Sequence, residues 1–173
     1  MIIYIAILAL GVIGFFIHLY ISEIPRTPFR VLELFMTYQL VFSIGLSSFL
    51  AFYGLAFLPN FVAAYTGWPA SPFEELLANV NLGYGVLGIM CIWFREHFWT
   101  ATIVGSSIWL LGDAGEHIYD ALVNNNYAPG NVGVPLYTDI IIPFVLLTCL
   151  PFYHSLRKKT AYTTPVSQKL IRD

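Results

Sequence analysis

The sequence predicts an all-α integral membrane protein, a bundle of five transmembrane helices with its N-terminus outside and its C-terminus inside. Hydrophobic residues make up 58% of the 173-residue chain and charged residues only 10%, whereas soluble domains carry roughly 25% charged residues. The apolar residues fall into runs close to the length of about 20 residues that crosses a bilayer as a helix. Lys and Arg occur only in alternate connectors and the tail, the pattern that the positive-inside rule describes.

The predicted spans follow the chain in order and are separated by turn-forming segments. They are residues 2–21, 31–58, 76–94, 98–123 and 138–156. The second and fourth runs exceed the usual length, so we expect tilt or extension past the bilayer. Pro25 and Pro28 end the first run, Pro69 and Pro72 precede the third, and an Asn-rich stretch separates the last two.

The basic residues all fall on one side of this predicted bundle. They are Arg26, Arg30, Arg95, Arg157, Lys158, Lys159, Lys169 and Arg172. The positive-inside rule therefore places the first connector, the third connector and the tail in the cytoplasm. We expect one transmembrane domain over residues 1–156 and a basic cytoplasmic tail over residues 157–173. The lipid bilayer is the expected partner. Nucleic acid is not, because the one basic cluster, at 157–159, is explained as a topology signal.

Most of the acidic residues fall on the opposite side, which contains no Lys or Arg. They are Glu74, Glu75, Asp113, Glu116, Asp120 and Asp139. Asp113, Glu116, His117 and Asp120 have the spacing i, i+3, i+4, i+7, so they form one stripe near the C-terminal end of the fourth helix. Acids there oppose the helix dipole and repel one another. A metal ion, protonation or donors from another helix should therefore compensate them.

The stripe predicts a divalent-metal site, with iron, zinc or manganese as the metal. The expected ligands are Asp113, Glu116 and His117 from the fourth helix and Glu75 from the third. Carboxylates with a His one turn away occur in helix-bundle di-metal sites, but the second Glu-x-x-His is absent, which favours a single metal ion.

Three further residues are expected to orient these ligands by hydrogen bonds: Asn79, Asp120 and Asp139. Asp139 is equally well explained as a cap of the fifth helix or as an acid that interacts favourably with the helix dipole. An open coordination position would make the site a metal-dependent membrane enzyme that activates water or dioxygen. Whether the protein is an enzyme stays open, and no catalytic residue is assigned.

Two other functions fit the same acids. In the first, the protein is a non-enzymatic subunit whose acidic surface docks a basic membrane partner, or a homo-oligomer. In the second, the acids and His117 belong to a cation or proton pathway. The polar side chains that could extend such a path across the bilayer are Tyr38, Gln39, Ser43, Ser47 and Ser106. Such groups more often form hydrogen bonds between helices.

Small residues predict close helix packing rather than chemistry. Gly85 and Gly88 lie in the third helix, and Ala101, Gly105 and Gly112 share one side of the fourth.

Two segments carry a family resemblance. The first is Asn81-Leu82-Gly83-Tyr84-Gly85-Val86-Leu87-Gly88-Ile89, and the second runs from Tyr127-Ala128-Pro129-Gly130-Asn131-Val132-Gly133 to Tyr137-Thr138-Asp139-Ile140-Ile141-Ile142-Pro143. They resemble a group of small, uncharacterised prokaryotic membrane proteins with NxAPGNxG and YTDxxIP patterns. The resemblance implies a helical membrane protein, in a prokaryotic plasma (inner) membrane, and brings no established activity.

Overall fold

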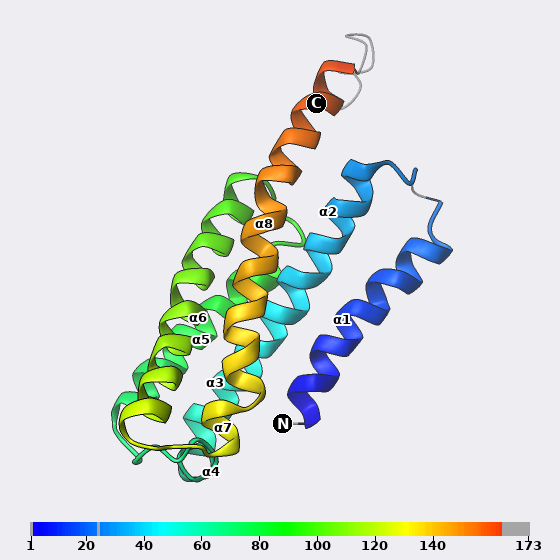
Figure 1. The fold of residues 1–173 in the computed structure, drawn as a ribbon. Coiled ribbons are helices and arrows are strands. Elements are labelled where there is room, and N and C mark those ends of the chain that lie inside the picture. The colour runs from blue at the N-terminus through cyan, green and yellow to red at the C-terminus, as the bar shows by residue number, and fades with distance from the viewer. Residues whose placement is uncertain (1, 24, 164–173) are drawn as a thin grey trace.

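The computed structural model describes residues 2–23 and 25–163, the last three by their backbone alone. The elements of this part are all helical, which confirms the all-α class (Figure 1). In chain order they are α1 (Ile2–Ile21), α2 (Pro28–Tyr38), the π-helix η1 (Gln39–Leu46), α3 (Ser47–Phe57), α4 (Pro59–Thr66), α5 (Phe73–Met90), α6 (His97–Val123), α7 (Pro129–Val132) and α8 (Val134–Thr163). The predicted tail residues Lys169 and Arg172 lie outside the described residues.

The apolar runs of the sequence correspond closely to these helices. The second run is one continuous rod made of α2, η1 and α3. The third helix ends at Met90, earlier than expected, because the chain turns over residues 91–93. The last helix begins at Val134, before the expected start, and Pro135 in its first turn suits that position because proline is preset for a helix start.

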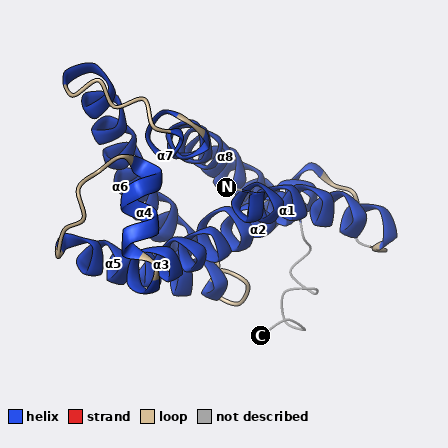
Figure 2. Cartoon of the chain, turned by 90° about the horizontal axis from the view of Figure 1, so that it is seen from below, coloured by secondary structure: helices blue, strands red, loops and turns tan. Residues whose placement is uncertain are grey.

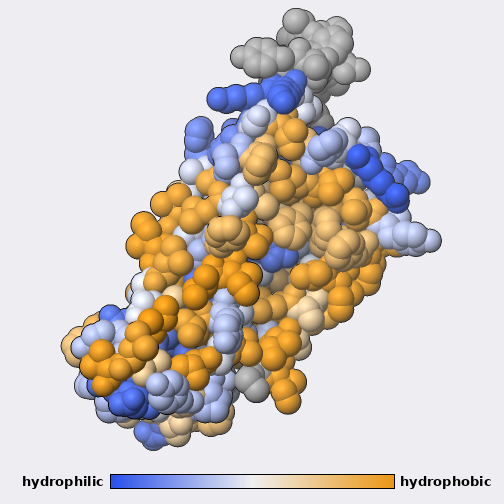
Figure 3. All heavy atoms as spheres, viewed as in Figure 1, coloured by the Kyte–Doolittle hydropathy of each residue, from blue (hydrophilic) through white to orange (hydrophobic). Residues whose placement is uncertain are grey.

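Within the described residues, three helices are long and apolar enough to cross a membrane. They span Ile2–Ile21, Pro28–Phe57 and Pro129–Thr160. Their outward faces are apolar, and Ile2 and Phe144 are each more than two-thirds exposed. Figure 3 shows a broad hydrophobic region between two hydrophilic ends. The predicted spans 76–94 and 98–123 form α5 and α6, which contain more polar residues.

The helices form two closely packed sets. α5 packs against α3 and η1, whereas α6 packs against α8, which also contacts α2. The backbones of α5 and η1 approach each other closely, since a Cβ at Gly88 would lie 2.4 Å from the Gly45 nitrogen. Gly85 likewise faces the ring of Phe49. Of the other small residues predicted to pack, Gly105 lies beside Tyr84, whereas Gly112 faces open space.

Opposite charges gather at opposite ends of the bundle. At one end, called the basic end here, lie the C-terminal end of α1, the start of α2, the α5–α6 turn and the end of α8 (Figure 1). Arg30 and Arg95 both pair with Glu33 there, and Arg157 pairs with Glu96. The acidic end contains α4, α7, the end of α6 and the start of α8. The charge segregation expected from sequence is therefore present in space.

Candidate functional site

His117 is the centre of a buried polar cluster at the acidic end. Its side chain is 5% exposed on α6. Its Nδ1 atom lies 2.7 Å from Oδ1 of Asn131, which belongs to α7 and is fully buried. The Asn131 amide nitrogen donates to two backbone carbonyl oxygens, those of His117 at 3.2 Å and Asn126 at 2.8 Å. Oδ1 is therefore the acceptor, and this network assigns the proton of the neutral ring to Nδ1. Nε2 is left free to take another proton or to bind a cation.

Asp139 faces this free nitrogen. Its Oδ2 lies 3.8 Å from His117 Nε2, and both side chains are about nine-tenths buried. Because α8 begins at Val134, Asp139 lies in the second turn of the helix, too far inside to cap it. The capping explanation is therefore wrong, and the helix instead presents this carboxylate to α6.

Asp113 adds a second carboxylate to the cluster. It lies one turn before His117 on the same face of α6 and is partly buried. It is close enough to repel Asp139 electrostatically, and Glu116 repels it in turn. Among the described residues, every Lys and Arg lies at the basic end, so none of them compensates this pair of acids.

Trp68 covers the other side of the histidine ring. The two rings are stacked, with centroids 5.0 Å apart and an interplanar angle of 23°. The indole nitrogen of Trp68 donates to Asp120 Oδ2 at 2.8 Å. Asp120 also accepts from Asn124 at 2.6 Å and from Asn126 at 2.5 Å. Asp120 therefore joins the loop after α6 to the connector after α4. It does not bind His117 itself but holds Trp68, which stacks on the histidine ring.

The other predicted site residues lie elsewhere. Glu116 is exposed on α6, and Glu75 and Asn79 are exposed on α5. In Figure 2, which looks onto the acidic end, the ends of α5 and α6 stand apart. Across residues 2–23 and 25–163, no group of three or more His, Cys, Asp and Glu side chains is arranged to hold a metal ion. The structure thus pairs His117 with Asp139 and places Asp113 one turn away on α6. Glu75, Asn79 and Glu116 lie outside this cluster.

Sequence reasoning did not assign a role to Asn131 or Trp68. Asn131 stands in the Tyr127–Gly133 segment quoted for the resemblance, but an asparagine beside Pro and Gly is typical of a turn. Trp68 is explained equally well as an aromatic anchor at the membrane surface. Their positions depend on how two loops dock, which no helical periodicity describes.

Comparison with protein families gives one match. The model described as "Family of unknown function (DUF6790)" matches residues 1–159. The chain belongs to this family. The match includes the whole cluster around His117, and it confirms the part of the resemblance that implied a family without an assigned activity. No curated protein and no solved structure matches the chain. Membership in DUF6790 brings no substrate, and the function has to be argued from the site.

Proposed function

We propose that this is an integral membrane protein that holds a proton between His117 and Asp139 at its outer end. The proposed topology has five spans with the N-terminus and the acidic end outside. The 18 residues of α5 and the 27 of α6 correspond to about 27 and 40 Å at 1.5 Å per residue, close to or beyond the hydrocarbon thickness of about 30 Å. The basic end then lies in the cytoplasm, as the positive-inside rule requires.

The cluster needs a cation because its charges are not balanced. Two carboxylates and a histidine lie together on α6 and α8, and the described basic residues are at the far end of the bundle. Uncompensated ionised groups away from water are costly, and in membranes such groups usually bind ions or carry protons. A bound cation removes this cost.

The surroundings of the imidazole favour a proton as that cation. Nδ1–H is held by Asn131, so an added proton goes to Nε2, directly opposite Asp139 Oδ2 at 3.8 Å. The charged ring gains an ion pair on that side, and the face of Trp68 interacts favourably with a cation on the other. The proposal rests on the free Nε2 of His117, which faces the Asp139 carboxylate in a ring that is stacked on the Trp68 indole.

A through-path for protons has weaker support. The Ser43 hydroxyl donates to Gln39 at 2.9 Å and the Ser47 hydroxyl donates to the Phe42 carbonyl oxygen at 3.1 Å. Both hydrogen bonds stay within the same rod. The proposal is therefore a proton-binding site at the acidic end, rather than a proton pathway across the membrane.

A divalent metal ion is the second candidate for the same atoms. Metal-binding histidines usually donate their other ring N–H to a fixed acceptor, as His117 does to Asn131. Two ligands of a tetrahedral ion with bonds near 2.1 Å lie about 3.4 Å apart, close to the separation of 3.8 Å between Nε2 and Oδ2. His117, Asp139 and Asp113 would bind iron, zinc or manganese. The metal ranks second because a third donor has to move in, whereas a proton needs only the existing pair.

A double-mutant cycle tests the proton proposal. We expect the coupling free energy between His117→Gln and Asp139→Asn to grow on acidification, to within the range of about 0.5–3 kcal/mol that contacting residues show. The measurement is unfolding in detergent at neutral and acidic pH, with chelator present throughout. The control cycle pairs His117→Gln with Glu116→Gln, because Glu116 is exposed and adjacent. A coupling near zero at both pH values would overturn the proposal.

A further inference from the structure

A second site of different character lies at the basic end. A cavity of about 910 Å³ opens between α1, the α2–η1 rod and the turn after α5. This volume is at the upper end of the range of about 300–1,000 Å³ that ligand pockets usually have. The cluster around His117 takes no part in it.

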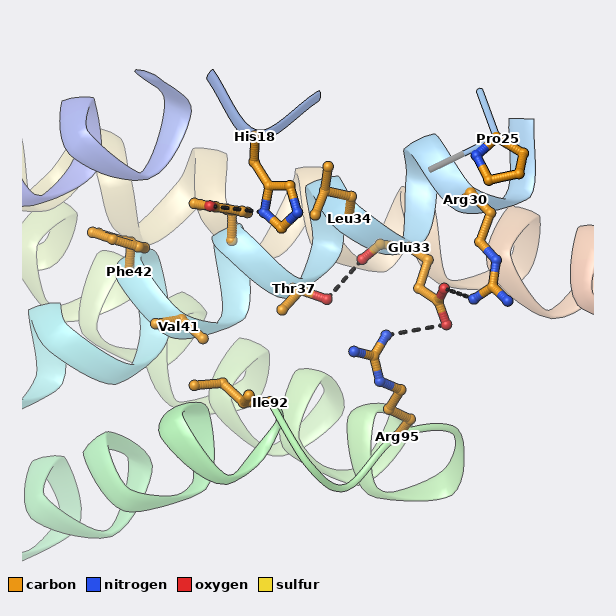
Figure 4. A pocket seen from close by; sticks show the side chains of 11 residues that line it. His18, Pro25, Arg30, Glu33, Leu34, Thr37, Val41, Phe42, Ile92 and Arg95 are labelled. Carbon is orange, nitrogen blue, oxygen red and sulfur yellow. Dashed lines mark hydrogen bonds and ion pairs between the residues drawn. The ribbon is translucent and has the colours of Figure 1, made fainter. Parts of the chain in front are cut away.

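One part of the wall is a preformed cationic group. Glu33 Oε2 lies 2.6 Å from Arg30 Nη1, and Glu33 Oε1 lies 3.1 Å from Arg95 Nη1. Figure 4 shows Arg95 reaching from the turn after α5 to the carboxylate on α2. One carboxylate between two guanidinium groups leaves a net positive charge. Each guanidinium has five N–H donors, and only part of each set faces Glu33.

The two arginines are held in place by more than this ion pair. Arg95 lies over the Trp99 ring at 5.4 Å, and Arg30 lies over the Phe29 ring at 5.5 Å. Glu33 itself is 9% exposed, whereas the two arginine side chains are each more than a third exposed. The Glu33 carboxylate is therefore buried, while the two guanidinium groups remain accessible. Two accessible guanidinium groups side by side, called the arginine pair below, suit a phosphate group, which arginine binds with paired hydrogen bonds.

The other part of the wall is apolar. Leu34, Val41, Phe42 and Ile92 line it, and Figure 4 shows Ile92 and Val41 facing the same space. Beyond them, Tyr38 and His18 join α1 to the rod, with His18 Nδ1 3.2 Å from the Tyr38 hydroxyl. A small hydrophilic anion would leave this apolar surface uncovered. The arginine pair beside an apolar wall therefore fits an amphiphile, a ligand with an anionic head group and an apolar chain.

We propose that this cavity binds an anionic phospholipid. The phosphate lies against Arg30 and Arg95, and part of one acyl chain lies along Leu34, Val41 and Phe42. This inference rests on the membrane placement proposed above, which puts the basic end in the cytoplasmic leaflet, where anionic lipids are concentrated. It does not depend on whether His117 binds a proton or a metal ion.

Native mass spectrometry of the delipidated full-length protein in a non-ionic detergent tests the proposal. The protein is titrated with phosphatidylglycerol and, separately, with phosphatidylcholine of the same acyl chains. We expect tighter binding of phosphatidylglycerol, and a loss of about tenfold or more in Arg30→Gln/Arg95→Gln, because charge-assisted hydrogen bonds to the phosphate disappear. Lys158→Gln/Lys159→Gln is the control, since it makes the same charge change at the same end but outside the cavity.

A second variant covers the case in which the double arginine variant fails to fold. Val41→Trp fills the apolar wall without changing any charge, and we expect it to weaken phosphatidylglycerol binding as well. His117→Gln should bind the lipid as the wild type does, which separates this site from the cluster at the acidic end. Three results would each overturn the proposal: equal binding of both lipids, equal loss in the lysine control, or displacement of the lipid by inorganic phosphate at equal concentration.

Discussion

The indole of Trp68 lies against the imidazole of His117, with ring centroids 5.0 Å apart and the ring planes 23° from parallel. Trp68 belongs to the connector that follows α4, and His117 belongs to α6. The contact therefore holds this connector against the buried histidine at the acidic end. The same indole donates to Asp120. One side chain therefore connects the histidine to the loop network that closes this end of the bundle.

Two substitutions at Trp68 separate its ring from its N–H group. Trp68→Phe keeps an aromatic ring beside His117 and loses the donor to Asp120, whereas Trp68→Leu loses both. We expect Trp68→Leu to be less stable than Trp68→Phe by about 0.5–1.5 kcal/mol, the usual worth of an aromatic pair. Chemical unfolding in detergent measures this difference. Equal stability of the two variants would show that the stacking contributes nothing.

Asn131 should be among the most sensitive positions of the acidic end. Asn131→Ala leaves the His117 Nδ1–H group and two backbone carbonyl oxygens without their partner in a buried place, which costs about 1–3 kcal/mol or more. Asn79→Ala is the matched control, because Asn79 is exposed on α5, and surface changes usually stay within about 0.5 kcal/mol. The two free energies of unfolding are measured in the same detergent. A comparable loss in both variants would contradict the assigned role.

Much of the fold could be predicted from the sequence, because run length and apolar composition determine where helices form. The α6 stripe was found in the same way, since residues at i, i+3 and i+4 lie on one face. The helix that faces this stripe could not be predicted from such spacing. Glu75 looked suitable because of its depth, but α5 packs against α3 and η1 through Gly85 and Gly88, which leaves α8 to face His117. Helix pairing of this kind depends on side-chain shape, which spacing does not encode.

The glycine contact that fixes this pairing can be tested directly. A Cβ at position 88 would lie 2.4 Å from the Gly45 backbone nitrogen, whereas nothing lies within 4 Å of a Cβ at Gly83. We expect Gly88→Ala to destabilise the protein by about 1–3 kcal/mol, as overpacking usually does. Gly83→Ala, in the same helix, should be neutral or slightly stabilising, because alanine favours a helix. Unfolding of both variants in detergent checks this, and a tolerated Gly88→Ala would contradict the close approach of α5 to η1.

The ion pair between Glu96 and Arg157 gives a pH dependence at the basic end. The hydrogen bond from Arg157 holds the pKa of Glu96 below its ordinary value of 4.5. The pair therefore contributes stability above that value, and the contribution is lost as the pH falls through the lowered pKa of the folded state. Because both side chains are partly exposed, solvent screening limits the contribution to about 0.2–1 kcal/mol.

Glu96→Gln should reveal this contribution. We expect it to reduce the stability at neutral pH by that amount, and to match the wild type at acidic pH, where Glu96 is protonated in both the folded and the unfolded state. Unfolding curves at a series of pH values measure the difference. A gap that persists in acid would mean that the loss comes from packing rather than from charge.

Elemental analysis distinguishes the two cations proposed for the acidic end. For a proton-binding site, we expect no stoichiometric iron, zinc or manganese in the detergent-purified protein. One equivalent of metal in the wild type that is absent from Asp113→Ala/His117→Ala would assign the site to the metal instead. Lys158→Ala/Lys159→Ala serves as the control for metal bound nonspecifically, because these lysines lie at the opposite end of the bundle.

Proton binding between His117 and Asp139 is tested most directly by nitrogen NMR of the histidine rings in protein labelled with ¹⁵N-histidine. The signal of His117 is assigned by its loss in His117→Gln. We predict that the neutral ring of His117 carries its proton on Nδ1. On acidification Nε2 should gain a second proton that is hydrogen-bonded to Asp139, and this hydrogen bond should be lost in Asp139→Asn. A neutral ring with its proton on Nε2, or a ring that stays neutral until the protein unfolds in acid, would contradict this prediction.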